Sequence, residues 1–297
     1  MMIKGLLHFF ETLRFLPLCL LRLLGAGLGR LLWRVAGRRR RIVRTNLRLC
    51  FPHLDSIVRD QLGKKQFVFV VQALLDRSWL WHASESTVKT RIRVTGDAAS
   101  LAMLTSNDPS QQSQPIVMFA PHFVGLDAGW TALGLEGSRE FTTIFTQQSS
   151  KQMDDWVYAG RMRFGRVRLF RKVQGVAEIV RSLKSGAALY LLPDMDFGAQ
   201  DTVFVPFYGQ SAATVTSLSR FARISGAKVL SVVTQLVPGG YEVNVGPVWE
   251  GFPTQDLQAD TERMNAELEA LIEPMPEQYY WVHRRFKTRP PGEASLY

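Results

Sequence analysis

Hydrophobic residues recur at helical spacing along the first 36 residues of the chain. The apolar row consists of Leu6, Phe10, Leu13, Leu20, Leu24, Leu28, Leu31 and Val35. Arginines fall on another face of the same pattern, at Arg22, Arg30, Arg34 and Arg41. Because proline has no N–H and clashes with the preceding helical turn, we expect Pro17 to kink or divide this helix.

This segment, followed by the basic run Arg38–Arg41, predicts an N-terminal membrane-associated helix. Its leucines would lie in the acyl region of a bilayer and its arginines on anionic lipid phosphates. No uncharged stretch reaches the roughly 18 residues typical of a spanning helix. Two alternatives stay open: a helix packed on the rest of the protein, or one tilted span with Arg22 reaching toward the interface. If the helix spans, Arg38–Arg41 puts the remaining chain on the cytoplasmic side.

Beyond residue 115, short apolar runs alternate with longer segments of helical pattern. The predicted strands cover residues 115–121, 141–146, 167–170, 187–192 and 228–236, with a hairpin return at 241–248. The predicted helices cover residues 57–83, 124–135, 149–163, 174–184, 214–225 and 257–273. This alternation predicts an α/β fold in which helices flank a central mixed, mostly parallel sheet. We expect two parts, an N-terminal helix in residues 1–45 and one domain in residues 46–297.

Charge and cysteine content narrow the class of protein. The formal net charge is +10, from 36 basic and 26 acidic residues. Residues 1–48 hold eleven of the basic residues and one acid, so the remaining 249 residues are neutral, with 25 of each. A protein that is basic only at its N-terminus is not typical of a nucleic-acid binder. Cys19 and Cys50 provide neither a disulfide framework nor a zinc-ligand cluster, so we expect no zinc site.

Polar residues follow two of the predicted strands directly, at His122 and at Asp194. Ligands of such sheets bind beyond the carboxyl ends of the strands. A histidine with a carboxylate five positions on, at Asp127, can form a general base and its orienting partner, which activates a hydroxyl. The alternative is a loop histidine beside a helix-capping acid. Because no G-x-S-x-G motif occurs, direct attack by a substrate hydroxyl is simpler than a covalent enzyme intermediate.

Five sequence blocks resemble, in the same order, those of the lipid A biosynthesis (lauroyl/myristoyl) acyltransferase family of the lysophospholipid acyltransferase superfamily. The blocks are Arg39–Ile42 with Asn46–Pro52, His122–Asp127, Gly160–Arg163, Pro193–Gly198 with Val203–Phe207, and Tyr280–Lys287. The second block resembles the family's H-x4-D/E motif, with Asp127 where some members carry Glu. The resemblance extends over nearly the whole chain.

This resemblance implies an enzyme of the bacterial inner membrane that faces the cytoplasm, so that residues 46–297 would be an acyltransferase domain. It would move a fatty acyl chain from acyl carrier protein onto a hydroxyl of a lipid A precursor, beside anionic membrane lipid and without a cofactor. On the same resemblance, His122 is the general base and Asp127 its partner. The thioester donor is already activated, so no protein nucleophile is required.

Two other functions stay open. Acylation of a glycerolipid or aminolipid uses the same motif, although such enzymes normally carry a glycine-rich block that is absent here. A non-catalytic membrane-binding protein would need only the N-terminal helix.

Further charged residues are candidates for substrate binding. Arg161 and Arg163, with Arg166 as a third candidate, could hold phosphate or carboxylate groups bidentately, or form a solvated helix end. Arg161 or backbone amides could stabilise a developing oxyanion. Asp194 and Asp196 could bind a divalent ion, orient Arg161 or form a turn. The resemblance implies a family that requires no metal for transfer, so we expect no metal site and favour the orientation of Arg161.

Two more segments have open roles. Trp79, Trp81 and His82 belong to the core, to a membrane-interface belt or to an acyl pocket. The basic segment His283–Lys287 would meet membrane phosphates or the acidic carrier protein, or form a solvated tail.

Overall fold

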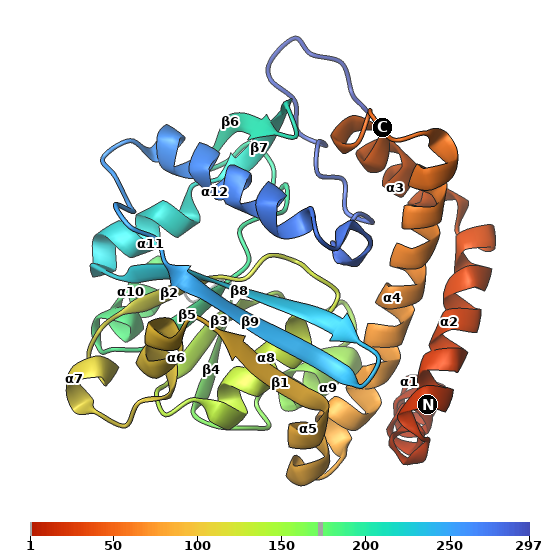
Figure 1. The fold of residues 1–297 in the computed structure, drawn as a ribbon, viewed down its shortest axis with the longest axis horizontal. Coiled ribbons are helices and arrows are strands. Elements are labelled where there is room, and N and C mark those ends of the chain that lie inside the picture. Colours follow the sequence, from red (N-terminus) through yellow and green to blue (C-terminus); the bar gives the residue numbers. More distant parts are fainter. Residues whose placement is uncertain (1, 172–174) are drawn as a thin grey trace.

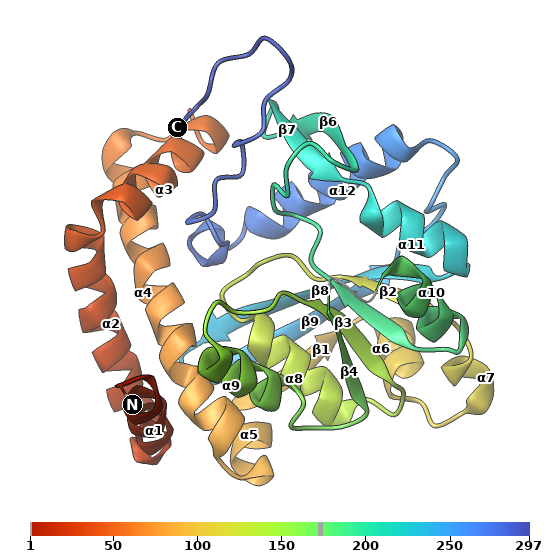
Figure 2. The same ribbon diagram turned by 180° about the vertical axis from the view of Figure 1, so that it is seen from behind.

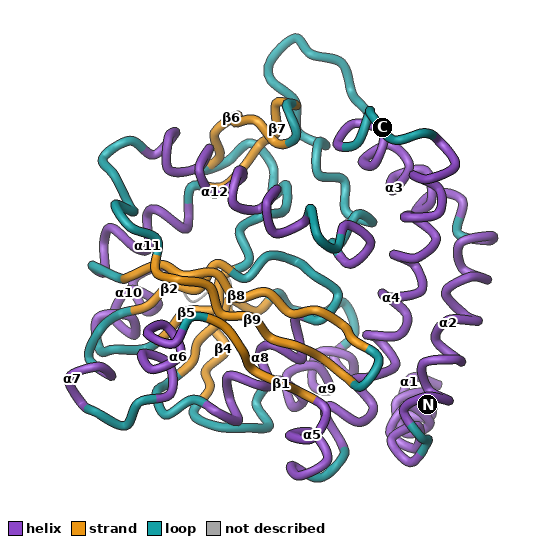
Figure 3. Tube along the Cα trace, in the orientation of Figure 1, coloured by secondary structure: helices purple, strands orange, loops and turns teal. Residues whose placement is uncertain are grey.

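The computed structural model describes residues 2–171 and 175–297, and its centre is a seven-stranded sheet between helices (Figures 1 and 3). The strand order is β1–β9–β8–β2–β5–β3–β4. The strands are β1 (Ile92–Gly96), β2 (Ile116–Phe119), β3 (Phe141–Phe145), β4 (Val167–Arg171), β5 (Ala188–Leu191), β8 (Lys228–Val237) and β9 (Gly240–Val248). Strands β2, β3, β4, β5 and β8 are parallel, whereas β9 is antiparallel to β8 and parallel to β1. The predicted α/β fold with a mixed, mostly parallel sheet is confirmed.

Helices cover both faces of this sheet (Figures 1 and 2). They include α6 (Ala98–Thr105), α8 (Leu126–Glu136), α9 (Lys151–Arg161), α10 (Val176–Lys184), α11 (Ser217–Ser225) and α12 (Leu257–Ile272). In β2, Val117 and Phe119 pack in one core with α10, α11 and α12, whereas Ile116 and Met118 pack in the other with α8 and α9. Because both faces are buried, the strand is a continuous apolar run rather than an alternating one.

Several short elements were not predicted. They are α5 (Glu85–Arg91), β1, α6, α7 (Pro109–Gln112), the 3-10 helix η3 (Pro276–Gln278) and the hairpin of β6 (Thr202–Phe207) and β7 (Gln210–Val215). The helix predicted to start at residue 214 begins at Ser217 instead, because Thr214 and Val215 pair with β6. The first residue of the predicted helix 174–184 lies outside the described residues.

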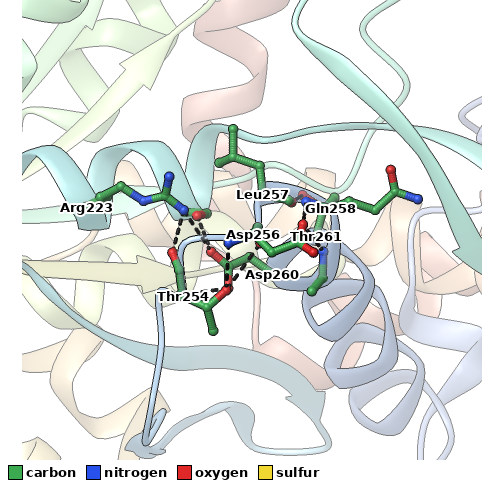
Figure 4. A network of polar contacts seen from close by, with 9 residues as sticks. Arg223, Thr254, Asp256, Leu257, Gln258, Asp260 and Thr261 are labelled. Carbon is green, nitrogen blue, oxygen red and sulfur yellow. Dashed lines mark hydrogen bonds and ion pairs between the residues drawn. The ribbon is translucent and has the colours of Figure 1, made fainter.

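Side-chain caps fix the start of α12 beside α11 (Figure 4). Asp256 caps α12 by accepting hydrogen bonds from two backbone amides of its first turn, at 2.8 and 3.1 Å. Asp260 accepts two hydrogen bonds from Thr254, both at 2.9 Å, and its carboxylate lies 3.5 Å from the guanidinium of Arg223 on α11. These contacts hold the two helices together on one face of the sheet.

The N-terminal segment folds into several helices. They are α1 (Met2–Thr12), the 3-10 helix η1 (Leu13–Phe15), α2 (Leu18–Val35) and α3 (Gly37–Cys50), and they are followed by α4 (Ser56–His82). Pro17 is the N-cap residue of α2, so the predicted division of the helix at this proline is confirmed. Helix α2 lies along α4 at one side of the molecule (Figures 1 and 2). The predicted boundary after residue 45 falls inside α3.

Small residues let α2 approach α4 closely. A Cβ atom at Gly25 would lie 2.8 Å from the Gln72 side chain, and one at Gly29 would lie 2.6 Å from the Cα atom of Val68. The leucine face of α2 points away from α4, with exposed fractions between 39% and 67%. It consists of Leu20, Leu23, Leu24, Leu28, Leu31, Leu32 and Val35. Most of the predicted apolar row therefore lies on the outer surface, although Leu13 is buried.

Arg22 lies on the buried side of α2. Its guanidinium is 2.8 Å from the Asp76 carboxylate and donates a hydrogen bond to the Gly240 carbonyl at 3.2 Å. The alternative in which Arg22 reaches toward a membrane interface is therefore wrong, because its charge is compensated inside the protein. Across residues 2–171 and 175–297, no helix combines the length and the apolar run needed to cross a bilayer. Membrane association of α2 stays a prediction.

Candidate active site

Two neighbouring strands bring His122 and Asp194 together. Strands β2 and β5 are parallel and in register, with Phe119 opposite Leu191, and each strand ends there. His122 and Asp194 each lie three residues further along, so the pairing of the strands places them side by side at the carboxyl edge of the sheet. This edge is where the strand pattern predicted the site.

Asp194 holds His122 through two hydrogen bonds. The His122 backbone N–H donates to Asp194 Oδ2 at 2.9 Å, and His122 Nδ1 lies 2.8 Å from Asp194 Oδ1. Because a carboxylate only accepts, the proton of this bond is on Nδ1. Nε2 of His122 makes no hydrogen bond within the described part of the chain, and 17% of the side chain is exposed. The ring therefore presents a free acceptor nitrogen at the edge of the sheet.

The environment keeps Asp194 ionised. Its side chain is fully buried, and burial alone would raise its pKa. The charge and hydrogen bonds of His122 outweigh burial, so the pKa of Asp194 is lowered from its ordinary value. The Tyr279 hydroxyl donates a further hydrogen bond to Asp194 Oδ2 at 3.0 Å. A fixed carboxylate of this kind can orient an imidazole and stabilise the imidazolium that forms when Nε2 accepts a proton.

Asp127 has different partners from those predicted. It lies in the first turn of α8, where its Oδ2 atom is 2.6 Å from Nη2 of Arg77 on α4 and its Oδ1 atom is 2.8 Å from Nε of Arg161 on α9. Within the described residues, no hydrogen bond joins it to His122. The predicted pairing of His122 with Asp127 therefore differs from the structure, because the turn after β2 carries the carboxylate toward α4 and α9. The catalytic roles of both residues stay predictions.

The two arginines make Asp127 strongly acidic. Burial opposes ionisation, but the charges of Arg161 and Arg77 and their hydrogen bonds lower the pKa of Asp127 to about 2. Arg161 uses only Nε for this bond, and its Nη atoms donate to no residue that the structure describes. The triplet of Arg77, Asp127 and Arg161 carries a net charge of about +1 near neutral pH. It can therefore attract a phosphate or carboxylate group.

Sequence patterns did not reveal Arg77. It is one residue of a long helical pattern, and no motif distinguishes it from the other basic residues of 57–83. The contact of Arg77 with Asp127 arises from the packing of α4 against α8, which brings the Arg77 guanidinium to this carboxylate.

Arg163 and Asp196 do not lie at the triplet of Arg77, Asp127 and Arg161. Arg163 donates hydrogen bonds to two carbonyls at the C-terminal end of α4, those of Leu80, at 3.2 Å, and of Ala83. Asp196 accepts hydrogen bonds from the backbone N–H and the hydroxyl of Thr288, at 2.6 and 2.8 Å. The expectation that Asp194 and Asp196 orient Arg161 is wrong, because these carboxylates bind His122 and the C-terminal segment instead.

The metal alternative for these aspartates has no support from side-chain clustering. In the portion of the chain that is described, no three His, Cys, Asp or Glu side chains are grouped as metal ligands. Arg166, the third arginine candidate, lines a surface cavity with Arg139 and Glu140 and is not in contact with Asp127.

The basic C-terminal segment is partly internal. Arg285 is buried and donates hydrogen bonds to the Ala213 carbonyl at 2.9 Å and to the Thr214 hydroxyl at 2.7 Å. The expectation that it meets membrane phosphates or a carrier protein is therefore wrong for this residue. His283 accepts a hydrogen bond on Nε2 from the Asp196 backbone N–H at 3.1 Å, and burial is the main cause that lowers its pKa to about 4. The C-terminal segment therefore packs against the loop that carries Asp194 and Asp196.

The aromatic cluster of α4 belongs to the core. Trp79 and Trp81 are buried, and Trp81 packs edge-on against Trp156 of α9 with ring centroids 4.5 Å apart. His82 accepts a hydrogen bond from Trp156 Nε1 at 3.1 Å. These contacts join α4 to α9, the helices that carry Arg77 and Arg161.

Comparisons with known proteins identify the family of the chain. The chain matches the family model described as "Bacterial lipid A biosynthesis acyltransferase" over residues 6–288. A "Lipid A biosynthesis palmitoleoyltransferase" of Escherichia coli (strain K12) is 33% identical over 95% of this chain and 90% of its own. A "Lipid A biosynthesis lauroyltransferase" of the same organism is 32% identical over the same shares, 95% and 90%. A "Lipid A biosynthesis myristoyltransferase" is 26% identical over 92% of this chain and 82% of its own. The chain belongs to the bacterial lipid A biosynthesis acyltransferase family.

Proposed function

We propose that the protein transfers a fatty acyl chain from acyl carrier protein to a hydroxyl group of a lipid A precursor, at the cytoplasmic face of the bacterial inner membrane. The family and the names of the relatives support the reaction class and the acceptor. The observation that carries the chemistry is His122, whose Nδ1 is bound to Asp194 while Nε2 is free to accept a proton.

In the proposed reaction, His122 Nε2 takes the proton of the acceptor hydroxyl as its oxygen attacks the thioester carbonyl carbon. The C–O bond forms, and the carbonyl oxygen becomes an oxyanion. When the oxyanion collapses, the C–S bond breaks and the thiolate of the carrier leaves, taking the proton from the imidazolium. No covalent enzyme intermediate, metal or other cofactor is needed, because the thioester is already an activated acyl donor.

The triplet of Arg77, Asp127 and Arg161 supplies the charge for substrate binding in this proposal. Asp127 fixes both guanidinium groups, while the Nη atoms of Arg161 stay available to a phosphate of the acceptor or to the developing oxyanion. Fixed donors stabilise such charge better than mobile ones, since no reorganisation is needed when the charge develops. Asp127 thereby contributes to catalysis through the arginines.

Membrane binding is also part of the proposal. The exposed leucine face of α2 is apolar, and the exposed side chains of Arg30, Arg34, Arg38 and Arg41 lie on α2 and at the start of α3. An apolar face with nearby arginines is typical of helices that lie in the interface of a membrane containing anionic lipid. Such an arrangement would hold the site beside a lipid acceptor.

The test is acyl transfer by the purified protein in vesicles, with a panel of acyl carrier protein thioesters and lipid A precursors and detection by mass spectrometry. We expect the acceptor to gain the mass of one acyl chain. Transfer to a glycerolipid or aminolipid but not to any lipid A precursor would overturn the proposed acceptor. The absence of transfer to every acceptor, with intact membrane binding, would favour a non-catalytic protein.

A further inference from the structure

The two buried carboxylates of the site have separate partners. Asp194 binds His122, whereas Asp127 binds Arg77 and Arg161. We propose that Asp194 is the positioning residue of the general base His122, and that the carboxylate of the H-x4-D motif positions the arginine pair instead. This inference rests on the proposed acyl transfer. It names Asp194 as the residue that keeps Nε2 of His122 ready to accept the proton of the acceptor hydroxyl.

The geometry around Asp194 favours a single imidazole tautomer. One carboxylate oxygen, Oδ2, accepts from the His122 backbone N–H at 2.9 Å and from the Tyr279 hydroxyl at 3.0 Å. The other oxygen, Oδ1, is left for His122 Nδ1 at 2.8 Å. Because both oxygens have donors, the carboxylate cannot turn without losing hydrogen bonds in a buried place, which costs about 1–3 kcal/mol for each unsatisfied group. The bond to Nδ1 therefore keeps Nε2 unprotonated.

The backbone makes the same arrangement rigid. His122 is held from two sides, by Asp194 after β5 and by the C-terminal segment, whose Tyr280 backbone N–H donates to the His122 carbonyl at 3.0 Å. Phe123 forms an isolated bridge with Tyr279, the residue whose hydroxyl reaches Asp194. The loop of His122 and the loop of Asp194 are thus joined by a third segment.

The variant Asp194→Asn tests this inference because it keeps the shape of the side chain. The Asn oxygen would take over the two hydrogen bonds of Oδ2, which turns the Asn amino group toward His122 Nδ1. Nδ1 must then accept rather than donate, so the proton moves to Nε2 and the base is blocked. We expect kcat to fall by about 10²–10⁴-fold, the usual contribution of a general base, with KM for the acceptor close to that of the wild type.

The dependence of rate on pH separates positioning from a merely structural role. Among the described residues, the titratable groups near His122 and its partner Asp194 include Tyr279, Tyr280 and His283. Loss of the negative charge of Asp194 disfavours the imidazolium, so the acid limb of the kcat profile should move to lower pH in Asp194→Asn. In Asp127→Asn, by contrast, we expect the acid limb to stay in place while KM for a phosphorylated acceptor rises.

Two further variants complete the comparison. Tyr279→Phe removes one donor to Asp194, so we expect a smaller fall in kcat than in Asp194→Asn. Asp260→Asn is the matched control, because Asp260 is also a buried carboxylate but lies in the first turn of α12, where it faces Arg223 of α11. The kcat of this variant should equal that of the wild type. Near-wild-type kcat in Asp194→Asn, or an acid limb that moves only in Asp127→Asn, would overturn the inference.

A second measurement needs no substrate and is made on the wild-type protein. ¹⁵N NMR of the histidine-labelled wild-type protein reports which ring nitrogen of His122 carries the proton, with the signal assigned by its loss in His122→Ala. We expect protonated Nδ1 and bare Nε2 at neutral pH. A proton on Nε2 would overturn the role of Asp194, even if no acceptor were found. Failure of the wild type to acylate any lipid A precursor would instead contradict the proposed function alone.

Discussion

At the scale of single residues, Asp127 links pH to stability. Its pKa in the folded protein is about 2, below its ordinary 3.8, because Arg161 and Arg77 outweigh the cost of burial. A lowered pKa stabilises the folded state above pH 3.8, and this stabilisation is lost as the pH falls from about 4 through about 2. We expect Asp127→Asn to lower the free energy of unfolding by about 2 kcal/mol at pH 7.

Denaturant unfolding of the wild type and Asp127→Asn over a range of pH checks this value. The difference between the two proteins should shrink as the pH falls from 4 toward 2, since the carboxyl group becomes neutral like the amide. A difference that stays constant over this range would show that the arginine contacts do not depend on the charge of Asp127.

His283 predicts a second pH effect, in a higher range. Its pKa is lowered from 6.5 to about 4, mainly by burial, and neutral Nε2 accepts the hydrogen bond of the Asp196 backbone. The neutral ring stabilises the folded protein above pH 6.5, and this contribution is lost as the pH falls through about 4. We expect the wild type to lose about 3 kcal/mol between pH 7 and pH 4 that His283→Gln does not lose.

Thermal unfolding at both pH values measures this difference. Parallel losses in the two proteins would assign the acid sensitivity to other groups.

The site was predictable in part at this scale. The apolar run of β2 and the polar residue after it identified His122, and a second such run identified Asp194. The partner of His122 was not predictable from the H-x4-D spacing, because adjacency of Asp194 arises from the pairing of β2 with β5. Arg77 had no signal of its own, since a single arginine in a long helix has no distinguishing context.

At the scale of elements, the contact of α2 with α4 depends on glycine. A Cβ atom at Gly29 would lie 2.6 Å from Val68 Cα and 2.9 Å from the Phe67 carbonyl oxygen, so the helix backbones would have to move apart. We expect Gly29→Ala to destabilise the protein by about 1–3 kcal/mol, as overpacking does. Gly27→Ala is the matched control on the exposed side of α2, where nothing lies within 4 Å.

Because alanine favours a helix over glycine, Gly27→Ala should stabilise the protein by about 0.5–1 kcal/mol. Urea unfolding of both variants in detergent gives the two values. If Gly29→Ala and Gly27→Ala changed the free energy of unfolding by the same amount, close packing of α2 on α4 at Gly29 would be contradicted.

The exposed face of α2 predicts how the protein binds membranes. Leu23 and Leu31 are 66% and 51% exposed, and neither is needed for contact with α4. Burial of a leucine side chain is worth about 1.5–3 kcal/mol, so replacing both by Glu should weaken vesicle binding on the order of 10²-fold or more. Ile224→Glu on α11 is the control, since Ile224 is 51% exposed but far along the chain from α2.

Sedimentation with vesicles of phosphatidylcholine and phosphatidylglycerol measures this binding. Retention of the double variant on the vesicles would contradict the role of α2, and the anchor would lie elsewhere.

Long helices were more predictable than short ones. The division at Pro17 and the helices around the sheet follow from periodicity that extends over many residues. The hairpin of β6 and β7 was missed although β2 and β5 are shorter strands, because it forms a separate two-stranded sheet and β6 contains Pro206, a residue that disfavours strands. The leucine row predicted the exposed face of α2, but the buried face, with Arg22 against Asp76, required knowledge of α4.

At the scale of the whole molecule, α4 connects the proposed membrane helix to the site. Its neighbouring residues Asp76 and Arg77 point to different partners, Asp76 to Arg22 of α2 and Arg77 to Asp127 of α8. The same helix therefore fixes the position of α2 and one side of the arginine pair. The α/β architecture was predictable from strand–helix alternation, whereas this connection depends on how distant segments pack.

The most direct test of the proposed acyl transfer is its single-turnover rate with an acyl carrier protein thioester and a lipid A precursor, measured for the wild type and for His122→Ala. Both proteins should bind vesicles equally, because His122 is not on α2. We predict that the rate falls by about 10²–10⁴-fold in His122→Ala, as expected when a general base is removed. A rate close to that of the wild type would contradict the proposed role of His122.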